Sequence, residues 1–154
     1  MTRRLAVCMV LLAAACGGGR APVPPTPATA ADAVVGFLDA VRLNDSRKMS
    51  ELWGDERGGA VAWMAPDELE KRLTVIQRYL AHSAYRIVDG PAPLRGQSDR
   101  VTFRVELRRG QCLHVQPIDL VRARQGGWIV WDVHLEAAGT PPAACSRVPP
   151  GTRD

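Results

Sequence analysis

The stretch VTFRVELRRGQCLHVQPIDLVRARQGGWIVWDVHLE, residues 101–136, decides the fold. In its first eight residues, apolar and polar side chains alternate from Val101 to Arg108. Strict alternation is typical of a strand with one buried face, the kind that antiparallel sheets use. The sequence therefore predicts an antiparallel sheet in the second half of the chain. The buried face of this strand is expected to consist of Val101, Phe103, Val105 and Leu107.

Three further strands are expected around this one. A strand over Ser83–Val88 precedes it and is expected to end at the turn residues Asp89-Gly90-Pro91. Arg109-Gly110 forms a plausible hairpin turn into a strand over Gln111–Arg124. The alternation of that strand is disturbed near Pro117, which indicates an edge, a bend or a bulge.

The last strand follows the turn Gln125-Gly126-Gly127. The first side chain of this strand is expected to point outward, so that the odd-numbered residues face the interior. The inward face is then Ile129, Trp131, Val133 and Leu135, and the outward face is Trp128, Val130, Asp132 and His134.

The first half of the chain is predicted to be helical. Apolar residues at helical spacing predict helices over Asp32–Leu43 and Arg47–Trp53, and 54–59 is expected to be a loop. Pro66 suits the first position of a third helix, whose apolar stripe is Leu69, Leu73, Ile76 and Leu80. Helices followed by antiparallel strands indicate the α+β class.

Three segments carry a family resemblance. FLDAVRLNDSRKMSELW (37–53), SDRVTFRVEL (98–107) and GGWIVWDVHLE (126–136) resemble the opening helices and closing strands of nuclear transport factor 2-like domains. The resemblance covers about 32–136. It implies a curved antiparallel sheet of about four or more strands that wraps around the N-terminal helices to form a cone.

The N-terminus has the features of an export signal. Arg3 and Arg4 precede an apolar stretch, Leu5–Ala15, which is too short to span a bilayer. Ala13-Ala14-Ala15-Cys16 resembles the lipobox of bacterial lipoproteins, and this resemblance implies that Cys16 becomes the lipidated first residue. A secretory signal cleaved before a free Cys16 and an uncleaved anchor remain as alternatives. Because Gly17 follows the cysteine, a Gram-negative cell is expected to place the protein on the outer membrane, facing the periplasm.

These features divide the chain into four parts: a signal peptide (1–15), a lipidated tether (16–31), an α+β domain (32–136) and a C-terminal tail (137–154). The tether and the tail are rich in proline, and such segments bury too little apolar surface to fold. The chain has 20 basic and 16 acidic residues, and loss of the leader lowers its net charge from +4 to about +2. This weak basicity argues against a nucleic-acid partner.

Two cysteines remain once Cys8 has left with the leader and Cys16 is acylated. Cys112 and Cys145 are an even pair in an oxidising compartment, so we expect them to form a disulfide that ties the tail to the sheet. Free thiols are the alternative.

Candidates for chemistry are few. An isomerase-like site needs a carboxylate base and an oxyanion donor, and the available residues are Asp39, Tyr79 and Tyr85. None of them matches a catalytic motif, and the alternative is a solvated aspartate with tyrosines at the rim of the core. The three histidines lack metal-ligand spacing. No metal and no cofactor is therefore expected.

The outward face of the sheet is a candidate interface with a protein partner or with a second copy of the chain. It is expected to present Arg104, Glu106, Trp128, Asp132 and His134. The alternative is a solvated face with cross-strand ion pairs. These observations favour a membrane-anchored, non-catalytic envelope lipoprotein whose domain binds a protein partner or an apolar small molecule. The alternative is a ketosteroid isomerase-like or dehydratase-like enzyme with its site inside the cone.

Overall fold

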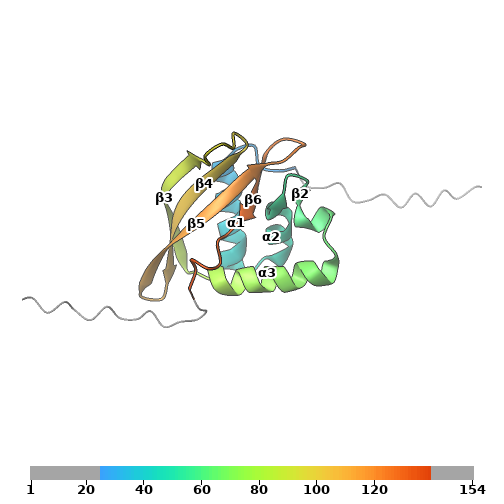
Figure 1. Ribbon diagram of the computed structural model, residues 1–154. Helices are drawn as coiled ribbons and strands as arrows, with labels where there is room; N and C mark the ends of the chain where they lie inside the picture. Colours follow the sequence, from blue (N-terminus) through green and yellow to red (C-terminus); the bar gives the residue numbers. More distant parts are fainter. Residues whose placement is uncertain (1–24, 140–154) are drawn as a thin grey trace, which may run out of the picture.

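The computed structural model describes residues 25–139, in which three α-helices pack against a four-stranded antiparallel sheet (Figure 1). The helices are α1 (Ala30–Leu43), α2 (Ser46–Leu52) and α3 (Pro66–Leu80). The sheet has the strand order β3 (Ala84–Pro93), β4 (Arg100–Arg109), β5 (Cys112–Arg122) and β6 (Trp128–Asp132). The predicted α+β class and antiparallel sheet are confirmed.

Local polar residues fix the ends of the helices. The Thr29 hydroxyl accepts the backbone N–H of Asp32 at 3.0 Å, which caps α1 at its start. Asn44 ends α1 in the left-handed conformation, with φ of 55°. The Asp45 carboxylate then accepts the backbone N–H of Lys48 at 2.9 Å and begins α2. Pro66 opens α3 as predicted.

A short hairpin occupies the segment after α2 that was predicted to be a loop. β1 (Gly54–Asp55) pairs with β2 (Gly58–Gly59), and the 3-10 turn η1 (Ala60–Ala62) follows before α3. A Cβ atom on Gly59 would lie 2.5 Å from the Glu51 carbonyl oxygen. The close approach of the two backbones therefore requires glycine at this position.

The edge strand β3 continues past its predicted end. It pairs with β4 from Ala84 to Pro93, with register shifts on either side of Asp89. Gly90 has φ of 109°, and a Cβ atom there would lie 2.7 Å from the Thr102 carbonyl oxygen. The prediction of a stop at Asp89-Gly90-Pro91 is wrong, because an edge strand accommodates proline and irregular pairing without ending.

Pro117 lies in a part of β5 that pairs with a neighbouring strand on one side only. It pairs with Arg104 of β4, whereas β6 pairs with β5 only over Asp119–Arg122. Of the three predicted explanations for the disturbed alternation, the edge is therefore the one observed at Pro117 itself. A register shift follows in the β5–β6 ladder, between Asp119 and Leu120.

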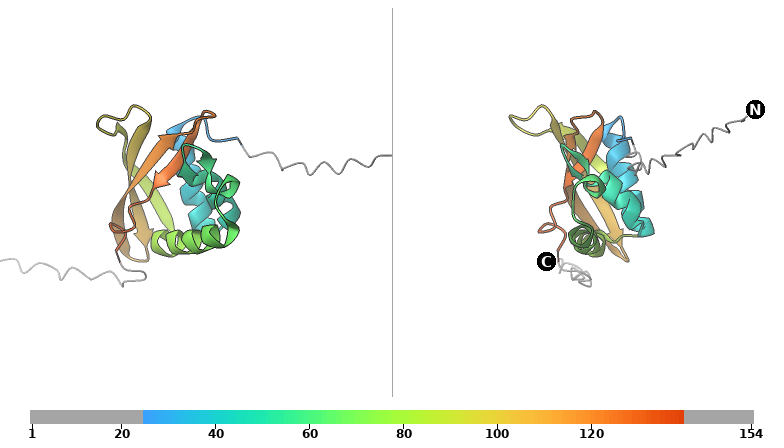
Figure 2. Two further views of the ribbon diagram at one scale, coloured as in Figure 1. Left: turned by 45° about the vertical axis from the view of Figure 1, so that its right-hand side comes forward. Right: turned by 90° about the vertical axis from the view of Figure 1, so that its right-hand side faces the viewer.

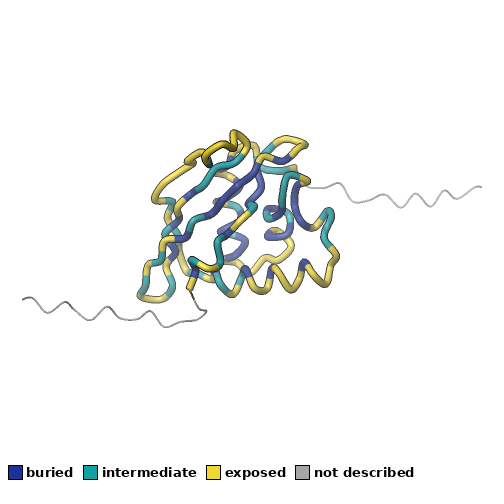
Figure 3. The backbone as a smooth tube through the Cα atoms, in the orientation of Figure 1, coloured by how far each residue is buried: buried dark blue, intermediate teal, exposed yellow. Residues whose placement is uncertain are grey.

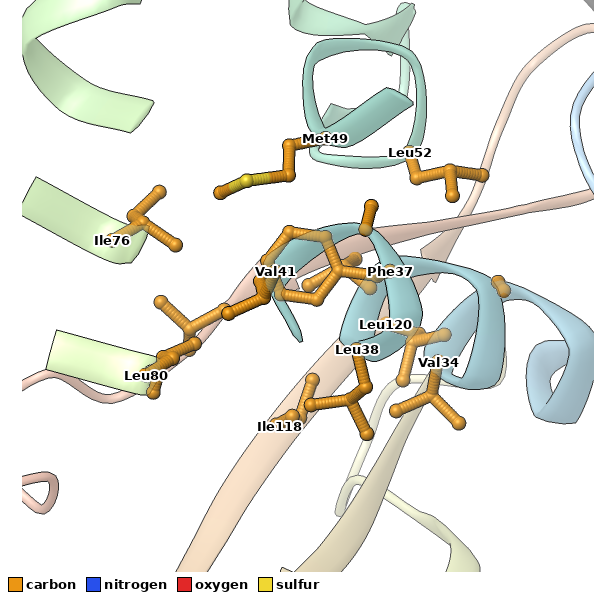
Figure 4. Close-up of a cluster of buried hydrophobic side chains, with 14 of the residues drawn as sticks. Val34, Phe37, Leu38, Val41, Met49, Leu52, Ile76, Leu80, Ile118 and Leu120 are labelled. Carbon is orange, nitrogen blue, oxygen red and sulfur yellow. The ribbon is translucent and has the colours of Figure 1, made fainter. Parts of the chain in front are cut away.

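The hydrophobic core lies between α1 and the sheet. Figure 3 shows the buried positions on the inner side of the sheet and along α1. Phe37 and Leu38 of α1 have no exposed surface, and Figure 4 shows them among side chains from α2, α3 and β5. The predicted inward face of β4 is confirmed, since Phe103, Val105 and Leu107 are buried and Val101 packs against them.

The packed unit reaches beyond the predicted 32–136 at both ends. The Thr26 hydroxyl donates to the Gly126 carbonyl at 2.5 Å, and the Trp128 N–H donates to the Pro27 carbonyl at 2.8 Å. Figure 2 shows this first part of the described chain beside the β5–β6 turn. At the other end, Arg109 donates to the Ala138 carbonyl at 2.8 Å.

Candidate functional site

An open groove of about 440 Å³ lies between α3 and the end of β6. One wall is α3, the opposite wall is β6 with the segment that follows it, and Trp53 stands at the end of α2. The lining is mostly apolar, with three charged side chains. Its residues are Trp53, Lys71, Arg72, Val75, Ile76, Trp131, Asp132, Val133 and Leu135.

The α3 wall is the flank of the predicted helical stripe. Leu69, Leu73, Ile76 and Leu80 are buried as predicted, and Val75, beside them, is 44% exposed. Lys71 and Arg72 lie one turn earlier and pair with Asp67 at 3.9 Å and with Glu68 at 2.7 Å. Exposed pairs of this kind contribute little to stability, so both cations can turn toward a ligand at small cost. The wall combines an apolar floor with a charged rim.

Trp131, which lines the groove, lies at a β-bulge. Leu120 pairs with Val130 and Asp119 pairs with Asp132, so Trp131 is the extra residue between two regular pairs. The guanidinium of Arg100 stacks on the indole at 3.8 Å from its centroid, and the same guanidinium bonds Glu56 at 2.5 Å. These contacts hold the ring in place.

A buried glutamine holds the segment that follows β6. Gln116 on β5 is 0% exposed, and its Nε2 donates to the carbonyls of Val133 at 2.6 Å and His134 at 2.9 Å. Its Oε1 has no hydrogen-bond partner in the described part of the chain. The wall that contains Val133 and Leu135 is thus held from the interior of the fold.

His134 holds the same segment from outside. Its Nε2 lies 3.0 Å from Asp119 Oδ2, and its Nδ1 lies 3.1 Å from Glu136 Oε1. The Asp119 carboxylate is 6% exposed and also accepts the Thr102 hydroxyl at 2.5 Å. Burial lowers the pKa of His134, but the hydrogen bonds to Asp119 and Glu136 outweigh it, and the net pKa is raised.

The predicted interface residues do not form one exposed set. Arg104 is exposed on the outer face of β4, and Glu106 beside it binds Arg86 at 3.2 Å. Asp132 and His134 lie at the end of β6, the last strand of the sheet, beside the groove. Trp128 is 9% exposed and belongs to the main core.

The prediction for Trp128 is wrong because the alternation in β6 is out of phase with the expected one. Trp128 and Val130 face the helices, whereas Ile129 packs with Val121 in a second cluster that Trp131 flanks. The bulge at Trp131 then reverses the phase, so that Val133 is buried as predicted. Four successive apolar residues hid this shift from the pattern.

Two of the three catalytic candidates meet, but away from the groove. Asp39 on α1 binds Arg42 at 3.1 Å, and its side chain is 42% exposed. Burial raises the pKa of Tyr85 on β3, and the nearby Asp39 carboxylate raises it further. The Tyr85 hydroxyl donates to the Val35 carbonyl at 3.4 Å. Tyr79 packs against the core from α3, and none of the three lines the groove.

The histidines and cysteines occupy separate places. His82 Nδ1 contacts the Leu80 carbonyl at the end of α3 at 2.8 Å, and His114 lies on β5. Within residues 25–139, no three His, Cys, Asp or Glu side chains are grouped to hold a metal ion. Cys112 is disulfide-bonded. Cys145, its predicted partner, and Cys16, the predicted lipidation site, lie outside the described residues.

The sequence patterns did not predict the groove, although the apolar side chains of Val75, Trp53 and Trp131 could have indicated an apolar surface there. Val75 adds an apolar side chain beside a complete helical stripe, and Trp53 follows directly after a short helix.

Comparisons with family models, with curated proteins and with solved structures find no match to the chain. Between residues 25 and 139, no helix has the length and apolar character needed to cross a membrane.

Proposed function

We propose that the protein is a lipid-anchored, non-catalytic module of a bacterial cell envelope whose domain binds an apolar small molecule in the α3–β6 groove. The observation that carries the proposal is the groove itself. Its volume of about 440 Å³ lies within the range of small-molecule sites, about 300–1,000 Å³. Apolar walls with a few polar groups at the rim are also typical of such sites.

Two contacts favour a small molecule over a protein partner at this position. Arg100 stacks on Trp131 at 3.8 Å, and Gln116 holds the opposite end of the wall through Val133 at 2.6 Å. A preformed concave site loses little conformational entropy when a small ligand binds. Little of the binding free energy is therefore lost in ordering the protein.

The proposed fold family is the nuclear transport factor 2-like one. Three features support it: two helices at the start, a short hairpin before α3, and four antiparallel strands that curve around the helices (Figure 2). The envelope location is proposed from Arg3, the apolar stretch Leu5–Ala15 and Cys16, whose order and spacing resemble those of lipoprotein leaders.

A charge placed inside the groove tests the binding site. N-phenyl-1-naphthylamine, an uncharged fluorescent probe, is titrated against wild-type protein, Val75→Glu and Thr74→Glu. Both positions are exposed on α3, but only Val75 lines the groove. We expect Val75→Glu to weaken binding about tenfold or more, because an apolar ligand in the groove would remove water from the new carboxylate, and Thr74→Glu to bind like wild type. No binding by wild type, or equal weakening in both variants, refutes the groove.

Labelled palmitate tests the anchor. Wild-type protein expressed in a bacterial host is expected to incorporate the label and to fractionate with membranes, and Cys16→Ser is expected to do neither. Wild-type protein that stays unlabelled contradicts the anchor and leaves the groove unaffected.

A further inference from the structure

His134 makes two hydrogen bonds that a neutral imidazole cannot make together. Its Nε2 lies 3.0 Å from Asp119 Oδ2 and its Nδ1 lies 3.1 Å from Glu136 Oε1. An ionised carboxylate only accepts hydrogen bonds, whereas a neutral imidazole carries a single N–H. With both carboxylates ionised, the imidazolium is the form that satisfies both contacts, and the neutral ring can keep only one of them as a hydrogen bond.

Among residues 25–139, the charged groups paired with the ring are all carboxylates. Asp119 comes from β5, Asp132 ends β6 with Oδ2 at 4.0 Å from Nδ1, and Glu136 belongs to the segment itself. Asp119 is the fixed partner, because it is buried and its other oxygen accepts the Thr102 hydroxyl. Glu136 is the mobile one, with a side chain that is 77% exposed.

The backbone at His134 connects this cluster to the groove. His134 has φ of 43°, and its N–H donates to Asp132 Oδ1 at 2.9 Å. Its two neighbours, Val133 and Leu135, and the carboxylate that it contacts, Asp132, all line the groove. The imidazole therefore belongs to the same short stretch of backbone that forms this wall of the groove.

We propose that His134 is a positioning residue of the groove: its imidazolium, bonded to Asp119 and Glu136, holds the Asp132–Leu135 wall in the binding position, so that an apolar ligand binds more tightly at low pH than at high pH. The proposal rests on the proposed function of the groove. Gln116 holds the same segment without titrating, so deprotonation weakens the wall and does not release it.

Thermodynamic linkage fixes the sign of the effect. The carboxylates raise the pKa of His134 above its usual value of 6.5 in spite of burial. If the protonated state favours ligand binding, then bound ligand raises this pKa further, by the same coupling free energy. The pKa of His134 in free and saturated protein is therefore a second readout, which a merely structural role of the residue would not move.

The test measures the affinity of N-phenyl-1-naphthylamine from about pH 5 to about pH 9, a range that brackets the usual histidine pKa of about 6.5. Wild type is expected to lose about fivefold in affinity as pH rises, the lower end of typical coupling between sites, because His134 is partly exposed. His134→Asn tolerates the left-handed backbone and does not titrate, so its affinity is expected to be flat across this range. His82→Asn, the same change away from the groove, is expected to keep the wild-type profile.

Glu136→Gln guards against a folding defect in the first variant, since Glu136 is exposed. It is expected to shrink the pH dependence and to lower the pKa of His134 measured by nuclear magnetic resonance. Binding that is equal at all pH values in wild type overturns the role of His134 and leaves the groove intact. Absence of probe binding at every pH overturns the proposed function, and the inference falls with it.

Discussion

The space between the helices and the sheet is filled under α1 and open beside α3. Phe37 and Leu38 on α1 have no exposed surface and pack among side chains of all three helices and of β5 (Figure 4). On α3, Val75 is 44% exposed and faces the groove. Both helices bury an apolar stripe, so the stripe alone does not decide which side of the fold is closed. The packing under α1 therefore closes one side of the fold, and the groove lies on the other side.

The largest expected difference between the two sides is in stability. Phe37→Ala is expected to lower the free energy of unfolding by about 3 to 5 kcal/mol, because a fully buried aromatic ring leaves a cavity. Val75→Ala removes methyl groups that already touch solvent, and its effect is expected to stay below about 1 kcal/mol. Urea denaturation of both variants measures the difference. Equal losses would mean that the groove is closed in solution.

Sequence alternation predicted the closed side well and the open side poorly. In β4, polar and apolar residues alternate without a break, so one assignment of faces is possible and Phe103, Val105 and Leu107 are buried as expected. In β6, four apolar residues in a row fit either assignment. The bulge at Trp131 reverses the phase, and a single sequence carries no signal for it.

The groove depends on contacts between distant segments, which local patterns do not encode. Trp53 and Trp131 are 78 positions apart in the sequence and line the same groove, where Trp53 forms a parallel bridge with Val130. The candidate carboxylate and phenol, Asp39 and Tyr85, were chosen by residue type, and the structure places them at the contact between α1 and β3. Residue chemistry alone thus suggested candidates without locating the cavity.

Gln116 stands between the two sides, and its replacement has the second largest expected effect. Gln116→Leu keeps the volume of the side chain but removes the donor that serves the Val133 and His134 carbonyls. We expect a loss of about 1 to 3 kcal/mol, the cost of leaving buried acceptors without a partner. Gln111→Leu, in the exposed β4–β5 turn, is the matched control and is expected to change stability by less than about 0.5 kcal/mol. A stable Gln116→Leu variant would show that the segment after β6 does not need this support.

His82 and His134 are expected to make the stability of the fold depend on pH in opposite directions. Burial lowers the pKa of His82, which lies near α1. The carboxylates around His134 raise its pKa, although burial opposes them. The stability that His134 contributes is fully present below its unfolded pKa and is lost as pH rises through its folded pKa. The contribution of His82 has the opposite sign, because its neutral form is favoured: it is present above the unfolded pKa and is lost as pH falls through the folded pKa.

The smallest expected effect is therefore a difference in slope. Denaturation of wild type, His82→Asn and His134→Asn across the titration range separates the two contributions. Loss of His134 is expected to cost most at low pH, by less than about 1 kcal/mol, because partly exposed ion pairs are weak. Loss of His82 is expected to improve stability at low pH relative to wild type. In wild type, folding at low pH must keep a buried ring neutral or bury its charge, and the variant has no such cost. If both variants lose stability most at the same end of the pH range, the carboxylates do not control His134, and the two sides of the fold respond to pH alike.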